Sequence, residues 1–263
     1  MDLQLKDKRA LVTGASSGLG YATAKLLLQE GCRVAINSSN ETKLKTAAES
    51  LRSATDGEAF PIPADLGTPD AAAQIVSEAA LVLGRLDILI CNAGGPPPGA
   101  FESFDDATWQ RAIDLSLMSN VRLIRAALPF LRQSQTASVL AITSVSTKQP
   151  LPNLILSNSI RLATIGLIKS LALELAGEGI RFNSILPGWT ETERVTHLMT
   201  SRAQSSGATP EEEARKQAKD IPLGRMGQPS EFANAAAFLV SPAASFITGV
   251  MLQVDGGSYK GTF

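Results

Sequence analysis

The stretch LVTGASSGLGYATAKLLL, residues Leu11–Leu28, decides the fold of this chain. It starts as an apolar run, turns through Gly14, Gly18 and Gly20, and continues with the spacing of an amphipathic helix. Glycines allow a tight turn in which backbone N–H groups can approach a phosphate, and a helix N-terminus favours an anion. A glycine-rich turn alone is a weak signal, but one placed between a first strand and a first helix predicts nucleotide binding.

The alternation of short apolar runs with longer amphipathic stretches continues along the chain. Strands are expected over Arg9–Gly14, Arg33–Asn37, Ala59–Asp65, Leu86–Asn92, Ser138–Ser144, Ile180–Gly188 and Gly249–Gly257. Helices are expected over Gly18–Glu30, Thr42–Ser53, Pro69–Leu83, Asp105–Arg132, Asn158–Ala176 and Ser230–Val240. Strands and helices that alternate at this spacing predict parallel pairing with right-handed crossovers. We therefore expect one α/β domain over residues 1–263, with a doubly wound parallel sheet of seven strands.

Composition limits the classes of partner. Lys plus Arg number 24 and Asp plus Glu number 25, for a net charge of −1, which argues against nucleic acid or an anionic membrane as the main partner. Cys32 and Cys91 fall in apolar runs and are expected to be core thiols, which fits a reducing compartment. The N-terminus has no signal pattern, and no apolar run reaches the length of a membrane span. A cytoplasmic protein is expected, and no metal site.

Residues 191–228 interrupt the alternation with a polar, charge-rich insertion. Because it follows the carboxyl end of a strand, where α/β sheets bind ligands, a mobile lid over a cleft is one interpretation. A solvated surface excursion is the other. The only histidine, His197, lies in this segment, and a lone histidine there is more often incidental than catalytic.

Further motifs follow the glycine turn in order. They are DL at Asp65–Leu66, NAG at Asn92–Gly94, PGWTET at Pro187–Thr192, IPLGRMGQPSEFA at Ile221–Ala233 and TGVMLQVDGG at Thr248–Gly257. Together with TGASSGLG, they resemble the signatures of the short-chain dehydrogenase/reductase family over nearly the whole chain. The resemblance implies a three-layer Rossmann-type fold and an NAD(P)-dependent oxidoreductase that acts on a carbonyl or an alcohol.

The resemblance also implies which residues bind the cofactor. In the glycine turn they are Gly14, Ser16, Ser17, Gly18, Leu19 and Gly20. Asp65 and Leu66 would contact the adenine, and Asn92, Ala93 and Gly94 would stabilise the central sheet beside the cofactor. Pro187, Gly188 and Thr192 match the family's PGxxxT motif, whose threonine contacts the nicotinamide amide.

The end of the second strand bears on the choice between NAD and NADP. A carboxylate there would bind the ribose 2′-hydroxyl of NAD, and an arginine would attract the 2′-phosphate of NADP. This chain has Asn37, Ser38 and Ser39 at the strand end, with Lys43 shortly after. Hydroxyls, an amide and a lysine can hydrogen-bond a phosphate, and no carboxylate repels it. NADP(H) is therefore the expected preference, with NAD(H) as the alternative.

The family's catalytic Asn-Ser-Tyr-Lys set is largely replaced. Ser144 retains the serine, but Ser157, thirteen residues later, stands at the tyrosine position and Arg161 at the lysine position. Asp114 in RAIDLSL aligns with the asparagine. A tyrosine with a pKa of about 10 can transfer a proton, whereas a serine hydroxyl needs a separate base. Arginine stays protonated, so it can stabilise an oxyanion or bind ribose hydroxyls without relaying a proton.

Two substitutes for the missing groups are considered. Lys148, on the loop after Ser144, could supply a proton or a positive charge, since a desolvated lysine can titrate near neutrality. Alternatively, Lys148 is a solvated loop residue. Asp114 could form an ion pair with Arg161 or Lys148, because a partly buried carboxylate requires a cationic partner.

AGGPPPGAF (93–101), TKQP and LSN..R resemble a divergent branch that is similar to β-ketoacyl-acyl-carrier-protein reductase.

Three functions remain open. The first function is an NADP-preferring oxidoreductase for a small carbonyl or alcohol, with 3-oxoacyl compounds as one candidate class. The second is a weak or inactive cofactor-binding pseudoenzyme that acts as a sensor or partner subunit, and the third is non-redox use of the cleft.

The apolar helix over 158–176 resembles the family's subunit contact, so a homotetramer or homodimer is expected. Whether a carrier protein binds stays open.

Overall fold

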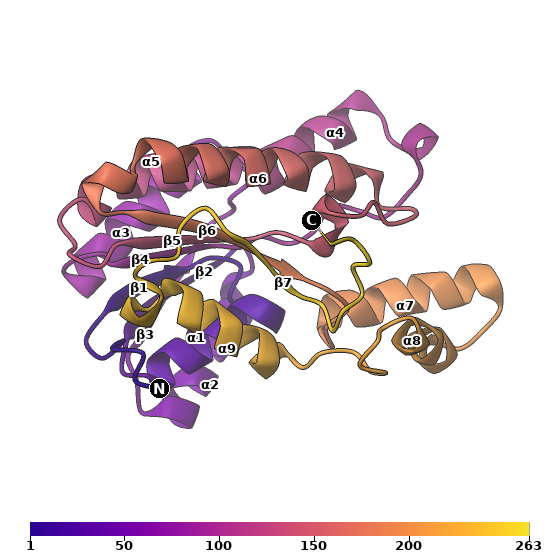
Figure 1. Cartoon of the computed structure of the whole chain (residues 1–263), viewed down its shortest axis with the longest axis horizontal. Coiled ribbons are helices and arrows are strands. Elements are labelled where there is room, and N and C mark those ends of the chain that lie inside the picture. The colour runs from indigo at the N-terminus through magenta and orange to yellow at the C-terminus, as the bar shows by residue number, and fades with distance from the viewer. Residues whose placement is uncertain (263) are drawn as a thin grey trace.

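The computed structural model describes residues 1–262 and has a parallel sheet at its centre (Figure 1). The strands are β1 Arg9–Val12, β2 Arg33–Ser38, β3 Ala59–Pro63, β4 Ile88–Cys91, β5 Ser138–Ile142, β6 Arg181–Pro187 and β7 Met251–Val254. They lie in the order β3-β2-β1-β4-β5-β6-β7, and every neighbouring pair is parallel. The predicted seven-stranded, doubly wound sheet is confirmed.

Helices cover both faces of the sheet (Figure 1). One face packs against α1 Gly18–Gln29, α2 Glu41–Thr55 and α9 Pro229–Val240, and the other against α3 Ala71–Leu83, α5 Ser119–Leu131 and α6 Ile155–Glu174. The inner strands β1, β4 and β5 are almost entirely buried because alternate side chains enter the two apolar cores, whereas the edge strands β3 and β7 are partly exposed. Within residues 1–262, no helix combines the length and apolar content needed to cross a membrane.

The predicted helix over Asp105–Arg132 runs without a gap from Asp106 to Leu131, but it is not α-helical throughout. It consists of α4 Asp106–Ile113, a π-helical turn over Asp114–Met118, and α5. A π turn accommodates an additional residue, so side chains after it face a different direction from those of an unbroken α-helix. This local change decides which residues of the segment face α6.

The insertion over 191–228 forms two helices, α7 Glu193–Ser206 and α8 Pro210–Lys219, that project from the body of the fold (Figure 1). The Thr192 side chain caps α7 by accepting a hydrogen bond from the Val195 N–H at 3.3 Å. Thr209 and Glu212 form a capping box at the start of α8. Each helix therefore begins at a residue whose side chain satisfies an exposed backbone donor.

Both cysteines are buried, free thiols, and their pKa values follow from that position. Burial raises the pKa of Cys91 to about 12, and burial together with nearby Asp87 raises that of Cys32 to about 12. Because folding disfavours the thiolate, the stability contributed by the neutral thiols is present below the ordinary thiol pKa and is lost as the pH rises toward 12.

We expect Ellman's reagent to leave both thiols of the native protein unmodified at pH 8 over minutes. Only about one thiol in 10⁴ would be ionised there, and the thiolate is the reactive form. In guanidinium chloride, both cysteines of each chain should react at once. Rapid modification of one thiol in the native state would contradict this burial.

Candidate functional site

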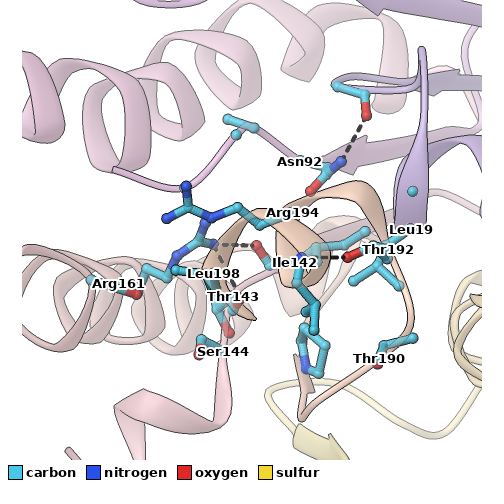
Figure 2. A pocket seen from close by; sticks show the side chains of 18 of the residues that line it. Leu19, Asn92, Ile142, Thr143, Ser144, Arg161, Thr190, Thr192, Arg194 and Leu198 are labelled. Carbon is cyan, nitrogen blue, oxygen red and sulfur yellow. Dashed lines mark hydrogen bonds between the residues drawn. The ribbon is translucent and has the colours of Figure 1, made fainter. Parts of the chain in front are cut away.

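A cavity of about 280 Å³ lies where the carboxyl ends of β1, β4, β5 and β6 meet α7 (Figure 2). This edge of a parallel α/β sheet is where ligands bind. Of the residues expected from the sequence to form the site, those that line the cavity are Gly14, Ser17, Gly18, Leu19, Asn92, Ala93, Gly94, Ser144, Ser157, Arg161, Pro187, Gly188 and Thr192. The structure therefore brings the two ends of the expected site, the glycine turn and the Ser144–Arg161 group, to one cavity.

The glycine turn presents free backbone donors to this cavity. Ser17 precedes α1 without forming a side-chain cap, and the first turn of α1 has no acidic residue. The N–H groups at Gly18 and Leu19 therefore remain available to an anion. Asn92 holds the turn in place, since its Nδ2 donates to the Gly14 carbonyl at 3.0 Å while the Thr13 hydroxyl donates to the Asn92 carbonyl at 2.7 Å.

The far end of the glycine turn meets β2 and β3, outside the cavity. Ser16 donates to the Ser38 hydroxyl at 2.9 Å. Ser39 is exposed beside it. Asn37 does not present its amide to a ligand, because the side chain is buried and donates to the Ile62 and Ala64 carbonyls at 2.9 and 3.0 Å. The assignment of Asn37 as a cofactor-binding side chain is therefore wrong, and its amide joins β2 to β3.

The loop after β3 and the start of α7 complete this region. The Asp65 carboxylate accepts from the Gly67 N–H at 2.9 Å, and neighbouring Leu66 is buried in the core. Lys43, at the start of α2, lies 3.6 Å from the Glu193 carboxylate of α7, and both side chains are largely exposed. Thr192 lies against the glycine turn, since a Cβ added to Gly18 would be 3.6 Å from its methyl group. The start of α7 thus contacts both the glycine turn and the start of α2.

The Ser144–Arg161 group lies on the other side of the cavity. The Ser144 hydroxyl oxygen accepts from the Ser146 N–H at 3.1 Å, which leaves its hydrogen available to donate. The Ser157 hydroxyl lies 3.4 Å from the hydroxyl of Ser146, not next to a base. Arg161 donates from one terminal nitrogen, Nη1, to the carbonyls of Ile142 and Thr143, each at 3.1 Å. Arg161 is therefore anchored to the end of β5 immediately beside Ser144 (Figure 2).

A second arginine, Arg194 of α7, lines the same cavity. Its Nη2 donates to the Pro96 carbonyl at 2.6 Å, so it connects α7 to the loop after β4. Burial lowers the pKa of Arg161 to about 10, with the charge of Arg194 as the second cause. Burial of the Arg194 guanidinium against the cavity wall lowers its pKa as well, although part of the side chain stays open to solvent. Both groups remain charged at neutral pH.

Asp114 does not face this cavity, so the expected ion pair with Arg161 or Lys148 is wrong. Its carboxylate accepts from Gln110 at 3.0 Å and from Arg122 at 2.9 Å, and these two contacts lower its pKa. The π turn directs Ser116 instead toward α6, where its carbonyl accepts from the Thr164 hydroxyl at 2.8 Å. Ser116 and Leu117 of this turn thus contact α6, Ser116 through its carbonyl and Leu117 by packing near Leu156 and Ile160.

Lys148 does not line the cavity either. The 3₁₀ turn over Val145–Thr147 directs its side chain to the C-terminal tail, where the ammonium lies 5.6 Å from the centre of the Tyr259 ring. This placement contradicts its expected role as a proton or charge donor at Ser144. His197 is exposed on α7 and does not line the cavity.

Sequence reasoning missed Arg194 and the rest of the α7 wall, formed with Glu193, Val195 and Leu198. Arg194 and Leu198 are four apart, a spacing that places both on one helix face, and this was the available signal. Behind this wall is a second, polar cavity of about 500 Å³ between α7, α8 and the loops after β4 and β5. The two cavities share Leu154, Trp189 and Leu198.

Comparison with known proteins agrees with this geometry. Residues 14–259 match a family model described as enoyl-(acyl carrier protein) reductase. The chain is 34% identical to the uncharacterized oxidoreductase YvrD of Bacillus subtilis, over 98% of both chains. It is 33% identical to the 3-oxoacyl-[acyl-carrier-protein] reductase FabG of Rickettsia felis, over 97% of this chain and 98% of that protein.

A solved structure is similar over the same length. The L-sorbose reductase of Gluconobacter frateurii, complexed with NADPH and L-sorbose, superposes with a TM-score of 0.94 at 29% identity, covering 99% of this chain and 100% of that one. The sheet order, the glycine turn and these full-length matches agree with one another. The chain belongs to the short-chain dehydrogenase/reductase family of oxidoreductases.

Proposed function

We propose that this protein is an NADP-preferring oxidoreductase that reduces a small carbonyl compound or oxidises the corresponding alcohol. The observation that carries the proposal is the cavity in which the uncapped start of α1 and the Ser144–Arg161 group face the same space. The relatives named 3-oxoacyl-[acyl-carrier-protein] reductase and the NADPH-bound L-sorbose reductase support this chemistry.

The residues present fit a nicotinamide dinucleotide. The free N–H groups at Gly18 and Leu19 would bind its diphosphate, and Ser38, Ser39 and Lys43 would face its adenosine end. Thr192 would contact the nicotinamide amide. Lys43 supports NADP because its present partner, Glu193, is exposed and therefore weakly held. When bound, the reduced cofactor supplies a hydride to the substrate.

The cavity side chains divide the remaining tasks. Ser144, whose hydroxyl hydrogen is uncommitted, would donate to the carbonyl oxygen. Arg161 would stabilise the negative charge that develops there, because a fixed, partly desolvated cation acts strongly on an oxyanion. Ser157 has no adjacent base and cannot replace a tyrosine by itself, so the proton would reach the oxygen through water that contacts Ser157.

Two further features belong to this proposal. The segment over 191–228 is a lid, supported by the position of Thr192, Glu193 and Arg194 in the cavity wall. Copies of the chain associate through α6, supported by Leu162 and Leu173, which are 52% and 75% exposed on this helix.

The direct test is a fluorescence titration with NADPH and NADH, followed by NADPH oxidation with a panel of sugars, oxo acids and 3-oxoacyl thioesters. We expect micromolar binding, tighter for NADPH, and turnover of at least one carbonyl class. Lys43→Ala should reduce the preference for NADPH by less than about tenfold, as for an exposed charge contact. NADPH binding without any turnover would favour a cofactor-binding protein that does not catalyse, and no binding would overturn the proposal.

A further inference from the structure

Arg161 and Arg194 approach each other in the cavity without a carboxylate partner (Figure 2). The ion pairs formed by residues 1–262 include neither of them. The one carboxylate in the cavity wall, Glu193, is directed to Lys43 at 3.6 Å. Arg161 is half-buried and Arg194 is exposed at the cavity wall. Two guanidinium groups placed close together without a counter-charge repel each other, so the space between them favours an anion.

The hydrogen bonds of the two arginines leave donors for such an anion. Arg161 donates from Nη1 alone, so its Nε and Nη2 make no hydrogen bond to the described part of the chain. Arg194 donates only from Nη2, to Pro96. A guanidinium with a free edge matches the two oxygens of a carboxylate. Backbone carbonyls anchor both groups, which reduces the entropy lost on binding.

The electrostatic surroundings favour an anion further. Arg194 lies in the first turn of α7, at the positive end of the helix dipole, where a cation is disfavoured. Repulsion between the two arginines adds to that cost. An anion bound between them would relieve both penalties, whereas a neutral ligand would relieve neither.

We propose that the cavity binds an oxo acid, with its carboxylate between Arg161 and Arg194 and its carbonyl oxygen at Ser144. The inference rests on the proposed oxidoreductase function and names its substrate class. Arg161 is bonded to the carbonyls of Ile142 and Thr143, the residues just before Ser144. A carboxylate on this guanidinium can therefore be only a few bonds from a carbonyl group at Ser144, as in a 2-oxo or 3-oxo acid.

The reaction balances for such a substrate. The carbonyl carbon gains a hydride from the reduced nicotinamide cofactor, which is oxidised, and the C=O double bond becomes a single bond. The oxygen gains a proton from solvent, and the product is the hydroxy acid. The carboxylate is unchanged, so the arginines bind both substrate and product.

The anion is assigned to the substrate because the diphosphate of a dinucleotide has its own site. Ser17, Gly18 and Leu19 supply that site at the start of α1, beside β1. Arg161 belongs to α6, and its guanidinium is bonded to the end of β5, on the Ser144 side of the cavity. Measuring cofactor binding in the absence of substrate shows whether the arginines bind a cofactor phosphate or a substrate carboxylate.

The experiment compares 2-oxobutanoate and 3-oxobutanoate with their methyl esters, which keep the carbonyl and remove the charge. Calorimetric titration of the NADP⁺-loaded protein measures binding without turnover, and NADPH oxidation measures kcat/KM. We expect the acids to bind roughly 10- to 100-fold more tightly than the esters, as for hydrogen bonds to a charged group. At least one acid should also be reduced with the higher kcat/KM.

Arg161→Gln and Arg194→Leu should each reduce the acid-over-ester ratio to near unity. Arg161→Lys retains the charge without the planar edge and should give an intermediate ratio. Arg215→Leu is the matched control, because Arg215 is exposed on α8 and does not line the cavity. Melting curves confirm that each variant is folded, and Arg194, on the outer helix, provides the test should Arg161→Gln not fold.

The outcomes separate the inference from the proposed function. Esters bound as tightly as acids would overturn the inference while leaving reduction of neutral carbonyls intact. Selective binding of acids without turnover would support the anion site and contradict the oxidoreductase function. Arginine variants that lose NADP⁺ affinity but keep the acid preference would assign the arginines to the cofactor and also overturn the inference.

Discussion

Replacing Arg181 with methionine should lower the free energy of unfolding by about 2–3 kcal/mol, the scale of hydrogen bonds from a charged donor whose loss leaves carbonyls unsatisfied. Arg181 begins β6, and its guanidinium donates to the carbonyls of Leu239, Val240, Ser241 and Ile247 at 2.7 to 3.3 Å. Helix α9 ends at Val240, so no further helical turn can satisfy the carbonyls of Leu239, Val240 and Ser241. Methionine preserves the length of the side chain and leaves every one of them without this donor.

Urea unfolding followed by circular dichroism measures this effect. Arg132→Met is the matched control, because Arg132 forms an exposed pair with Glu178 and its loss should cost less than about 1 kcal/mol. Arg181→Lys should recover part of the difference, since an ammonium reaches fewer carbonyls. A loss below 1 kcal/mol for Arg181→Met would show that water satisfies the carbonyls equally well.

Gly20→Ala should destabilise the protein by about 3 kcal/mol and weaken NADPH binding, because it forces the glycine turn apart. A Cβ at position 20 would lie 2.3 Å from the Gly14 carbonyl oxygen and 2.8 Å from the Asn92 amide nitrogen. Neither contact can relax by rotation of a flexible side chain end, since Asn92 itself holds the turn. The backbone donors of the turn would therefore move relative to each other.

Thermal unfolding and the NADPH titration are the two measurements for this variant. Gly177→Ala is the control, because a Cβ there meets no atom within 4 Å and the change should be within about 0.5 kcal/mol of neutral. An alanine at position 20 that left both stability and NADPH affinity unchanged would disprove the close approach of Gly14 and Gly20.

The repeating parts of the fold were predictable from the sequence, because an apolar core on each side of a sheet imposes a regular pattern. The departures occur where that regularity fails. Asp114 was assigned to the cavity by position along a helix, and the π turn at the same residue rotates the chain so that Ser116 faces α6. A count of residues cannot detect the additional residue in this turn.

The remaining differences arise from contacts between distant segments. Lys148 was expected at the cavity from its place after Ser144, but its partner, Tyr259, lies in the tail. The Asn37 side chain is polar and was expected to contact a ligand, yet its amide donates hydrogen bonds to two carbonyls at β3. Arg194 lies in a charge-rich segment, where an arginine is usually solvated. Its place in the cavity wall depends on how α7 packs beside the glycine turn, which the sequence pattern does not reveal.

If the segment over 191–228 is the proposed lid, its hold on the glycine turn consists of Thr192 against Gly18 and of the Glu193–Lys43 pair. A dinucleotide laid along the glycine turn has to part these contacts before it enters and again before it leaves. The pair is exposed, so its attraction falls as salt screens it. The residence time of the proposed cofactor would then shorten as ionic strength rises.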